Sequence, residues 1–532
     1  MKTKEIIQRL CLFLLVLVPT MPAGAEDIRI GSKADWQTFC NRVNGGEVTL
    51  NAEMTDNVDL GTDIMMVGIN NDYSGTFDGR GYTLSFHWTD TDHRTAPFKY
   101  VNGATIRNLR TQGKIASNSF ALSGLIYCAY GSTTISGCVS DVDLTCNNPY
   151  VESQLGGMLS SIYYGSDVTF TDCIVKGNIT ATTNKGKKGI GGFVVYNGWA
   201  LNTTLILNNC LYIGTNNAGD ESCTFASADA TINNCYYLNA CGTAQGTPVT
   251  KAQLESGEIT KRLQGERTDT CHWAQVLGDM PSLYREADKM KPNYVYYDTA
   301  NYRWACENFV LTDGKPLPVG LNFTAATATY ERDLSAGKAT VCLPYELPVR
   351  GFKAYTLSTV QGTPSTVRFK RVTDKLEAYK PYLLTADGAP RLDGENLQVK
   401  AFNAAAMTTT TGDYSLVGTT ENMDNITAVA ANAYILQGDG KFHKVTADNP
   451  TATIPSYRAY ITRNGSQGAK QISFILNGET TGIDGVTDGA IDTDGAVYDL
   501  QGRRVVDRLD DNARRQLPAG VYIGGGKKVV VK

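Results

Sequence analysis

The chain has 532 residues, with 49 lysines and arginines against 53 aspartates and glutamates, so its formal net charge is −4. This length exceeds what one hydrophobic core supports and predicts two to four domains. The acidic balance argues against nucleic acid or an anionic membrane surface as the main partner. The 53 glycines and 28 tyrosines favour many short strands joined by turns.

Residues 1–25 have the pattern of a secretory signal peptide. Three basic residues precede an apolar run, Cys11 to Pro19, and "AGA" at 23–25 fits a cleavage site. That run is too short to span a bilayer, and no later segment has 18 consecutive apolar residues, so we expect no integral membrane protein. Removing three basic residues and one acidic residue with the signal changes the formal charge from −4 to −6. We expect an exported protein that starts near Glu26.

A short unit recurs five times: "TIRNL", "TISGC", "TFTDC", "ILNNC" and "TINNC". Its last residues are 29, 35, 37 and 25 positions apart, which is the size of a solenoid repeat. The residue before the last is always one that tolerates a left-handed backbone. These corner residues are Asn108, Gly137, Asp172, Asn209 and Asn234. The pattern predicts one sharp corner per rung of a parallel β-helix.

The residue after each corner is Leu or Cys, and we expect these side chains to form one inward column. The column consists of Leu109, Cys138, Cys173, Cys210 and Cys235. Equivalent positions of a solenoid stack about 4.8 Å apart, and a free cysteine packs there as a small hydrophobe. Disulfides between rungs fit an exported protein, but parallel stacked side chains do not meet easily. With no C-x-x-C pair and only 4 His, we expect no metal site.

Glycine-led apolar segments precede three of the corners: "SGLIY", "GGMLSSIYY" and "GGFVVY". Together with "GTFDGRGYTL" and the lead-in "ADWQTFCNRVNGG", they resemble the GLUG-type repeats of bacterial surface β-helices over roughly residues 30 to 240. The resemblance implies a right-handed parallel β-helix on a cell surface. Thr250 and Gln253 then form a possible capping box. We expect short helices, broken near Gly257, to cover the open solenoid edge and to complete a domain at 26–285.

From residue 290 to 477 the repeat is absent, and short segments with alternating apolar residues follow one another, such as "FKAYTL", "TVRFKRV" and "YRAYITR". This pattern predicts half-buried strands in a β-sandwich-like domain. The segment resembles a β-module found beside such repeats in secreted proteins of Gram-negative bacteria. An acidic linker follows at 478–496. Its "DTDG" is not a calcium loop, because Ala490 and Gln501 occupy ligand positions.

Residues 497–532 contain "VYDLQGRRVV" and "AGVYIGGGKKVVVK", and they resemble the C-terminal sorting modules of type IX secretion substrates. The matching positions are Tyr498, Asp499, Leu500, Gly502, Arg503, Gly520, Tyr522 and Lys532. The module is short and lacks the usual Pro-Asn-Pro start. The resemblance implies a route through the periplasm, by way of the secretion machinery, to the exterior or outer surface of a Gram-negative bacterium.

No nucleophile, metalloprotease or nucleotide-binding motif occurs. Because polysaccharide lyases also use β-helices, paired carboxylates were considered: Asp141 with Asp143, and Asp90 with Asp92 beside His93. Lys176 and Lys185 are the nearest basic residues after the first pair, but their spacing does not recommend them. We interpret both pairs as solvated strand faces or loops, and we expect no catalytic residues and no cofactor.

Aromatic side chains on solenoid strands and loops are candidates for ligand binding. The candidates are Tyr163, Tyr164, Tyr196, Trp199, Tyr212, Tyr236 and Tyr237. We therefore expect an all-β adhesin-like protein, not an enzyme, that binds glycans or a host or bacterial surface protein through its β-helix. The alternatives are a secreted polysaccharide-degrading β-helix and a purely structural surface spacer.

Overall fold

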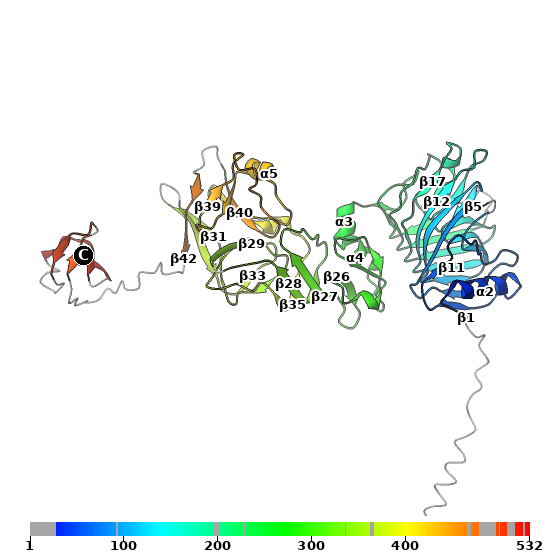
Figure 1. Cartoon of the computed structure of the whole chain (residues 1–532), viewed down its shortest axis with the longest axis horizontal. Coiled ribbons are helices and arrows are strands. Elements are labelled where there is room, and N and C mark those ends of the chain that lie inside the picture. Colours follow the sequence, from blue (N-terminus) through cyan, green and yellow to red (C-terminus); the bar gives the residue numbers. More distant parts are fainter. Residues whose placement is uncertain are drawn as a thin grey trace, which may run out of the picture. The chain divides into compact units, whose positions relative to one another are not determined.

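The computed structural model describes residues 28–91, 94–195, 202–226, 229–335, 337–361, 366–464, 470–477, 496–499, 501–507, 516–524 and 527–531 (Figure 1). The predicted signal peptide and nearly all of the predicted linker lie outside the described residues. The chain divides into two compact units. The first comprises Met1–Arg332, Pro344–Leu347 and Leu392–Asn403, and the second comprises Asp333–Leu343, Pro348–Arg391 and Ala404–Lys532.

The first unit begins with a parallel β-helix, coloured from blue to green in Figure 1. Successive rungs pass through four parallel sheets, which we name A to D. Sheet A consists of β1 (Ile28–Ile30), β2 (Ala52–Met54), β4 (Thr76–Asp78), β7 (Thr105–Arg107), β11 (Ser132–Ser136), β15 (Asp167–Thr171), β19 (Thr204–Asn208) and β21 (Thr231–Asn233). Sheet B consists of β3 (Val58–Asp59), β5 (Thr83–Thr91), β8 (Arg110–Ser117), β12 (Val139–Cys146), β16 (Ile174–Val175), β17 (Ile179–Ala181), β20 (Leu211–Tyr212), β22 (Tyr236–Tyr237) and β23 (Thr247–Pro248).

Two smaller parallel sheets complete the rungs. Sheet C consists of β6 (Phe98–Asn102), β10 (Ile126–Tyr130) and β14 (Leu159–Ile162), and sheet D of β9 (Ala121–Ser123), β13 (Gln154–Gly156) and β18 (Ile190–Gly191). The register is regular, since Ile135 of β11 is opposite both Ile106 and Phe170 in the neighbouring rungs. Equivalent apolar side chains therefore stack, and one continuous core fills the solenoid.

The lead-in segment folds as helix α2 (Lys33–Asn44) and covers the first rungs. Its N-cap is Ser32, whose hydroxyl accepts a hydrogen bond from the backbone of Asp35. The buried face of α2 joins the solenoid core. There the ring of Trp36 packs edge-on against Phe77 and Phe98, with centroids 5.8 and 5.9 Å apart.

The predicted corners are confirmed, because all five have a positive φ. The angles are 52° at Asn108, 61° at Gly137, 54° at Asp172, 53° at Asn209 and 50° at Asn234. Each corner joins a strand of sheet A to the next strand of sheet B, so the recurring unit marks one fixed point of the rung.

The predicted capping box is present, since Thr250 and Gln253 exchange side-chain and backbone hydrogen bonds at the start of α3 (Lys251–Glu255). Gly257 has φ 84° and separates this helix from α4 (Glu258–Gln264). The expected position of the helices needs correction. They pack on the outer face of sheet B, where Leu254, Ile259 and Leu263 join one outward residue from each of four strands. Those strand residues are Val139, Ile174, Leu211 and Tyr236. The helices pack on this face because its apolar column buries their apolar side chains.

A six-stranded mixed sheet follows within the first unit. In spatial order it contains β25 (Ser282–Leu283), β24 (Trp273–Val276), β26 (Tyr294–Asp298), β27 (Arg303–Thr312), β28 (Phe323–Glu331) and β35 (Gly394–Val399). The predicted domain boundary at 285–290 does not coincide with the division into units. Strands β24 and β26 pair across that boundary, so backbone hydrogen bonds join its two sides.

The second unit contains two sheets that share one core. One sheet is β29 (Gly337–Val341), β34 (Tyr382–Ala386), β31 (Lys353–Gln361), β32 (Thr366–Val372) and β42 (Phe474–Asn477); the other is β36 (Thr408–Thr411), β37 (Tyr414–Gly418), β40 (Ala459–Arg463), β38 (Ala433–Leu436), β39 (Phe442–Lys444) and β41 (Gln471–Ile472). Tyr355 and Phe369 of the first sheet pack with Leu416 and Phe442 of the second. This arrangement is sandwich-like. Shorter elements of the chain are β30 (Leu347–Pro348), β33 (Lys375–Leu376), α5 (Asn425–Ala430), η1 (Gly186–Lys188), η2 (Glu286–Asp288) and η3 (Ala404–Met407).

The C-terminal segment forms a four-stranded antiparallel sheet. Its order is β44 (Arg504–Val506), β43 (Val497–Tyr498), β45 (Gly520–Gly524) and β46 (Lys527–Val531). Val497 and Tyr522 are buried in a small core of its own.

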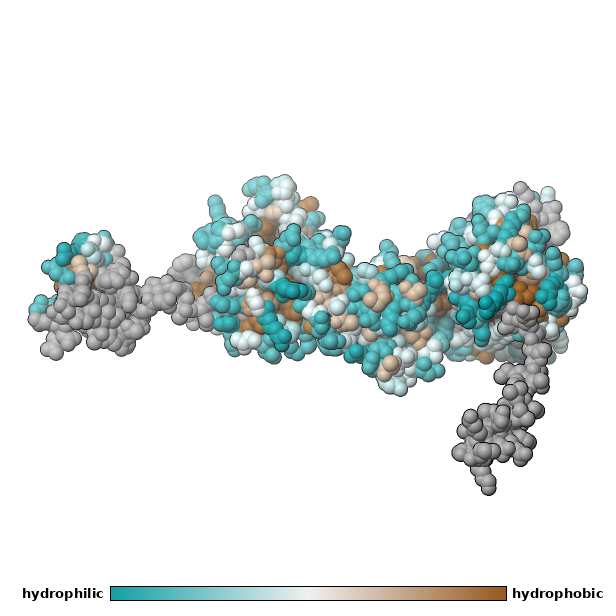
Figure 2. Space-filling model, turned by 60° about the horizontal axis from the view of Figure 1, so that its bottom comes forward, coloured by the Kyte–Doolittle hydropathy of each residue, from teal (hydrophilic) through white to brown (hydrophobic). Residues whose placement is uncertain are grey.

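In the described part of the chain, no helix is long and apolar enough to cross a membrane. On the face shown in Figure 2, hydrophilic residues predominate and hydrophobic residues form small separate patches.

Candidate functional site

A row of tyrosines crosses sheet C along the solenoid, and we name Tyr100, Tyr127, Tyr130 and Tyr163 the tyrosine strip. Tyr100 lies on β6, Tyr127 and Tyr130 lie on β10, and Tyr163 follows β14. The Tyr130 and Tyr163 rings are 4.5 Å apart between centroids, and Tyr100 lies 5.5 Å from Tyr127 and 6.2 Å from Tyr130. Since adjacent rungs stack about 4.8 Å apart, the strip extends over three rungs.

The tyrosines of the strip differ in exposure. Tyr127 is buried with 6% of its surface exposed, whereas Tyr163 is 54% exposed, as is its neighbour Tyr164. Burial raises the pKa of Tyr127 to about 12, so its hydroxyl stays protonated and can donate a hydrogen bond. The strip is thus buried at Tyr127 on its middle rung and exposed to solvent at Tyr163 on its last rung.

Two cations border the strip. The guanidinium of Arg94 lies 5.4 Å from the Tyr127 ring centroid, and the Lys99 ammonium lies 5.8 Å from that of Tyr100. Cations at such distances are attracted to the ring faces. Burial, together with Arg94, lowers the pKa of Lys99. The strip therefore combines aromatic faces with hydrogen-bond donors.

The structure separates the predicted aromatic residues into three groups. Tyr163 and Tyr164 are exposed as expected, whereas Tyr196 and Trp199 lie outside the described residues. The expectation of surface exposure is wrong for the other three: Tyr212, Tyr236 and Tyr237 have 0%, 8% and 8% of their surface exposed.

The buried tyrosines have distinct structural roles. Tyr212 and Tyr237 point into the solenoid core, where the Tyr212 hydroxyl accepts a hydrogen bond from Asn216 at 3.2 Å. Tyr236 points outward but lies beneath α3 and α4, and its hydroxyl donates to Asn234 at 2.6 Å. Alternation along β22 does direct one tyrosine outward, but the helices that follow in the chain cover it.

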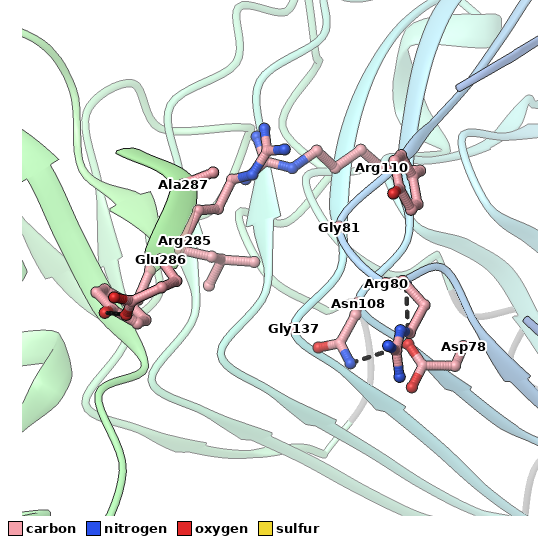
Figure 3. Close-up of a pocket in the computed structure, with 12 residues that line it drawn as sticks. Asp78, Arg80, Gly81, Asn108, Arg110, Gly137, Arg285, Glu286 and Ala287 are labelled. Atoms are coloured by element: carbon pink, nitrogen blue, oxygen red, sulfur yellow. Dashed lines mark hydrogen bonds between the residues drawn. The ribbon is translucent and has the colours of Figure 1, made fainter. Parts of the chain in front are cut away.

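A polar pocket of about 460 Å³ lies within the first unit, between the early solenoid corners and the segment around η2 (Figure 3). Arg80, Arg110 and Arg285 are among its lining residues, as are Tyr82 and Tyr284. In Figure 3 the Arg110 and Arg285 side chains extend toward each other. Burial, and to a smaller extent the positive charge of Arg285, lowers the pKa of Arg110, while the charge of Asp288 opposes this shift. Its Nε is buried without a hydrogen-bond acceptor.

Asp78 organises the floor of this pocket. Its carboxylate accepts hydrogen bonds from the Arg80 backbone at 2.8 Å and from the Asn108 side chain at 3.1 Å, both drawn in Figure 3. It also forms an ion pair with Arg107 at 2.9 Å. Asp78 is therefore fully engaged in fixing the corner next to it.

A second carboxylate, Asp172, joins the solenoid to the segment that follows α4. Arg267 binds it with two hydrogen bonds of 2.7 and 2.9 Å, and the indole of Trp273 donates to it at 2.7 Å. The His272 ring lies 3.4 Å away, and burial lowers its pKa below 6.5 despite the nearby carboxylate. Asp172 is thus both a corner residue and a docking point.

The inward column lies where the repeat places it. Leu109, Cys138, Cys173 and Cys210 are 0% exposed and Cys235 is 2% exposed, all within the solenoid core. The twelve described cysteines are free thiols. Burial raises the pKa of Cys138 and Cys210, so these thiols are inert as nucleophiles.

The paired carboxylates considered for catalysis are surface residues where described. Asp141 and Asp143 are exposed on β12, and Asp143 accepts a hydrogen bond from the Asn178 backbone at 2.9 Å. Lys176 is half-buried near Asp141, and burial lowers its pKa, while Lys185 donates to the Tyr150 carbonyl. The Asp90 side chain, Asp92 and His93 lie outside the described residues, as does Ala490. In the described ranges no group of three His, Cys, Asp or Glu residues is placed to hold a metal.

In the C-terminal sheet, Asp499 forms a turn by accepting hydrogen bonds from the backbones of Gln501 and Arg503 and by pairing with the Arg503 side chain at 2.8 Å. The hydrogen bond from the Arg503 backbone lowers the pKa of the Asp499 carboxyl group. Tyr522 is buried and donates to the Pro518 carbonyl at 2.8 Å. Tyr498 is 40% exposed, and Gly502 has φ 80°. Gly520 begins β45, whereas Leu500 and Lys532 lie outside the described residues.

Sequence reasoning missed Tyr100, Tyr127 and Tyr130, although a signal was present. The segments "FKYVNG", "LIYCAYG" and "SIYYG" each place tyrosine shortly before a glycine of positive φ, namely Gly103, Gly131 and Gly165. Aligning on this second corner would have revealed the strip. The arginine pocket carried no such signal, because its residues lie far apart in the sequence.

No family model and no curated protein sequence matches the chain. Among solved structures, it is weakly similar to the enzymatically active domain of tailspike protein 4 from bacteriophage CBA120. The identity is 13% and the TM-score 0.13, over 69% of this chain and 64% of that domain. The chain thus spans less than two thirds of the domain it matches.

Proposed function

We propose that this protein is an exported, adhesin-like protein that binds glycans through the tyrosine strip and the adjoining Tyr164. The observation that supports the proposal is the strip itself, a line of neighbouring rings over three rungs that ends in two side chains more than half exposed. Aromatic faces beside a few polar groups suit the apolar faces and hydroxyls of sugar rings.

The strip also supports the solenoid, and not the sandwich-like unit, as the ligand-binding part of the protein. The exposed Tyr163 and Tyr164 lie where sheet C ends, just before the positive-φ residue Gly165. Repeat proteins commonly bind their ligands along one face of the stacked repeats. Export and surface location form part of the proposal on the strength of residues 1–25 and 497–532, through their resemblance to signal and sorting sequences.

A glycan array probed with the mature chain, residues 26–532, tests the binding role. Replacing both Tyr163 and Tyr164 by alanine should weaken binding at least tenfold, about 1.4 kcal/mol, since each lost ring contact is worth about 0.5–1.5 kcal/mol. The matched control is Tyr150→Ala, because Tyr150 is 80% exposed on another solenoid loop.

Equal binding by the double variant and the wild type would refute the role of the strip. Glycans retained on the array should also be incubated with the protein and assayed for reducing ends. Their release would establish the alternative, a polysaccharide-degrading enzyme, while the absence of any glycan ligand would favour a structural spacer.

A further inference from the structure

The arginine pocket brings two positively charged side chains together, those of Arg110 and Arg285. Arg110 extends from β8 and Arg285 precedes η2, and in Figure 3 their side chains extend toward each other. Among the described residues, neither guanidinium has an ion pair with a carboxylate. Two like charges at one cavity leave a site that an anion would stabilise.

The carboxylates around this pair have other partners. Asp78 is paired with Arg107 at 2.9 Å, Asp288 is paired with Lys291 at 2.9 Å, and Glu286 accepts a hydrogen bond from the Tyr284 hydroxyl. None of them is free to turn toward the arginines without losing these contacts. The carboxylates nearest the two arginines are therefore held by other groups.

The fold does not require an arginine at position 110. On the following rungs the same outward position of sheet B holds Val139, Ile174, Leu211 and Tyr236, which pack beneath the helices. An apolar residue would continue that column at no electrostatic cost. Arg110 instead has a buried Nε without a hydrogen-bond acceptor. An unsatisfied buried donor destabilises the folded protein, and a bound anion that accepts this hydrogen bond would remove the cost.

We propose that this pocket binds the oxyanion of an acidic saccharide, a carboxylate or sulfate group, between Arg110 and Arg285. The volume of about 460 Å³ suits a small ligand, and Tyr82 and Tyr284 supply ring surfaces beside the charges. Guanidinium forks match carboxylate and sulfate oxygens in geometry. The saccharide part of the assignment rests on the proposed glycan binding, whereas the oxyanion part rests on the pocket alone.

Calorimetric titration of the mature chain at constant ionic strength tests the pocket, with sodium glucuronate, glucose and sodium sulfate as probes. Glucuronate should bind and glucose should not, because they differ at the carboxylate. Sulfate should bind if the site takes sulfated sugars, and its failure would restrict the site to carboxylates. Arg110→Leu and Arg285→Gln should each weaken glucuronate binding at least tenfold.

Two controls keep the result specific. Arg350→Gln, at an exposed arginine of the second unit, should leave binding unchanged, and Arg110→Leu should melt no lower than the wild type. Binding of glucose as tight as that of glucuronate, absence of glucuronate and sulfate binding, or unchanged binding to Arg110→Leu would overturn the proposal. Loss of neutral-glycan binding in the Tyr163 and Tyr164 double variant, with glucuronate binding intact, would show that strip and pocket are separate sites.

Discussion

At the residue scale, the corner side chains do more than tolerate a left-handed backbone. The Asn234 amide donates to the Asn209 side chain at 2.8 Å, and the neighbouring Asn233 donates to Asn208 at 2.9 Å. These bonds run from rung to rung along the solenoid. Gly137 is the exception, because a Cβ there would lie 2.7 Å from the Asn108 side-chain oxygen. Corner identity is therefore set by both the backbone and the residue stacked below it.

The cysteine column predicts that Cys173→Ser lowers the free energy of unfolding by roughly 1–3 kcal/mol, because a hydroxyl is costly to bury without a well-placed acceptor. The nearest acceptor of the Cys173 thiol, the Thr171 carbonyl, is 3.4 Å away, too far for a strong hydroxyl bond. Urea denaturation followed by circular dichroism measures the change. Cys223→Ser, at a half-buried cysteine, should cost less; equal midpoints for all three proteins would contradict the prediction.

At the element scale, one outward column and one carboxylate dock the segment that follows the solenoid. Leu263 of α4 packs on the apolar column of sheet B, and Arg267 and Trp273 bind Asp172 at the neighbouring corner. Each cysteine of the inward column is followed by a residue that points outward into this apolar column. The repeat therefore encodes the docking surface as well as the core. Because apolar packing is non-directional, the polar contacts to Asp172 determine where the segment docks on this apolar surface.

This docking predicts a pH dependence that originates at His272. Burial lowers its folded-state pKa below 6.5, so the unfolded chain binds the proton more tightly. The stabilisation is complete above pH 6.5 and decreases as the pH falls through the lower, folded-state pKa. Urea midpoints at pH 7.5 and 5.5 should differ less in His272→Gln than in the wild type. Identical pH dependence in both proteins would exclude His272 as the cause.

At the scale of the whole molecule, the β-helix and the mixed sheet of the first unit differ in how far apart in the sequence their paired strands lie. Rungs contact mainly their neighbours, whereas β28 pairs with β35, some 70 residues later. A fragment ending at residue 285 would lack β26, the strand that pairs with β24. Loss of binding in that fragment could then come from incomplete folding. Point variants of the full chain are the better comparison.

The C-terminal sheet predicts a separable sorting function. Among the described residues its four strands pair only with one another, and residues 497–532 carry eight basic and four acidic residues. Deleting this segment should leave the other sheets folded, because it removes none of their strands, and should retain the protein in the periplasm. Cell fractionation, with circular dichroism as the folding control, measures both effects. Normal surface display of the truncated protein would refute the sorting role.

The β-helix, its corners and the buried column could be predicted from the sequence, because they depend on contacts that recur at regular intervals, and the capping box could be predicted because it joins residues three positions apart. Which outward side chains stay exposed could not be predicted in this way, because it depends on segments that pack from elsewhere in the chain. Tyr236 alternates outward as its strand pattern dictates, yet α3 and α4 cover it, whereas Tyr163 has no such cover. The arginine pocket likewise joins Arg110 to Arg285 across 175 positions of sequence. Periodicity specifies which way a side chain points, but exposure and charge pairing depend on which distant segment packs above it.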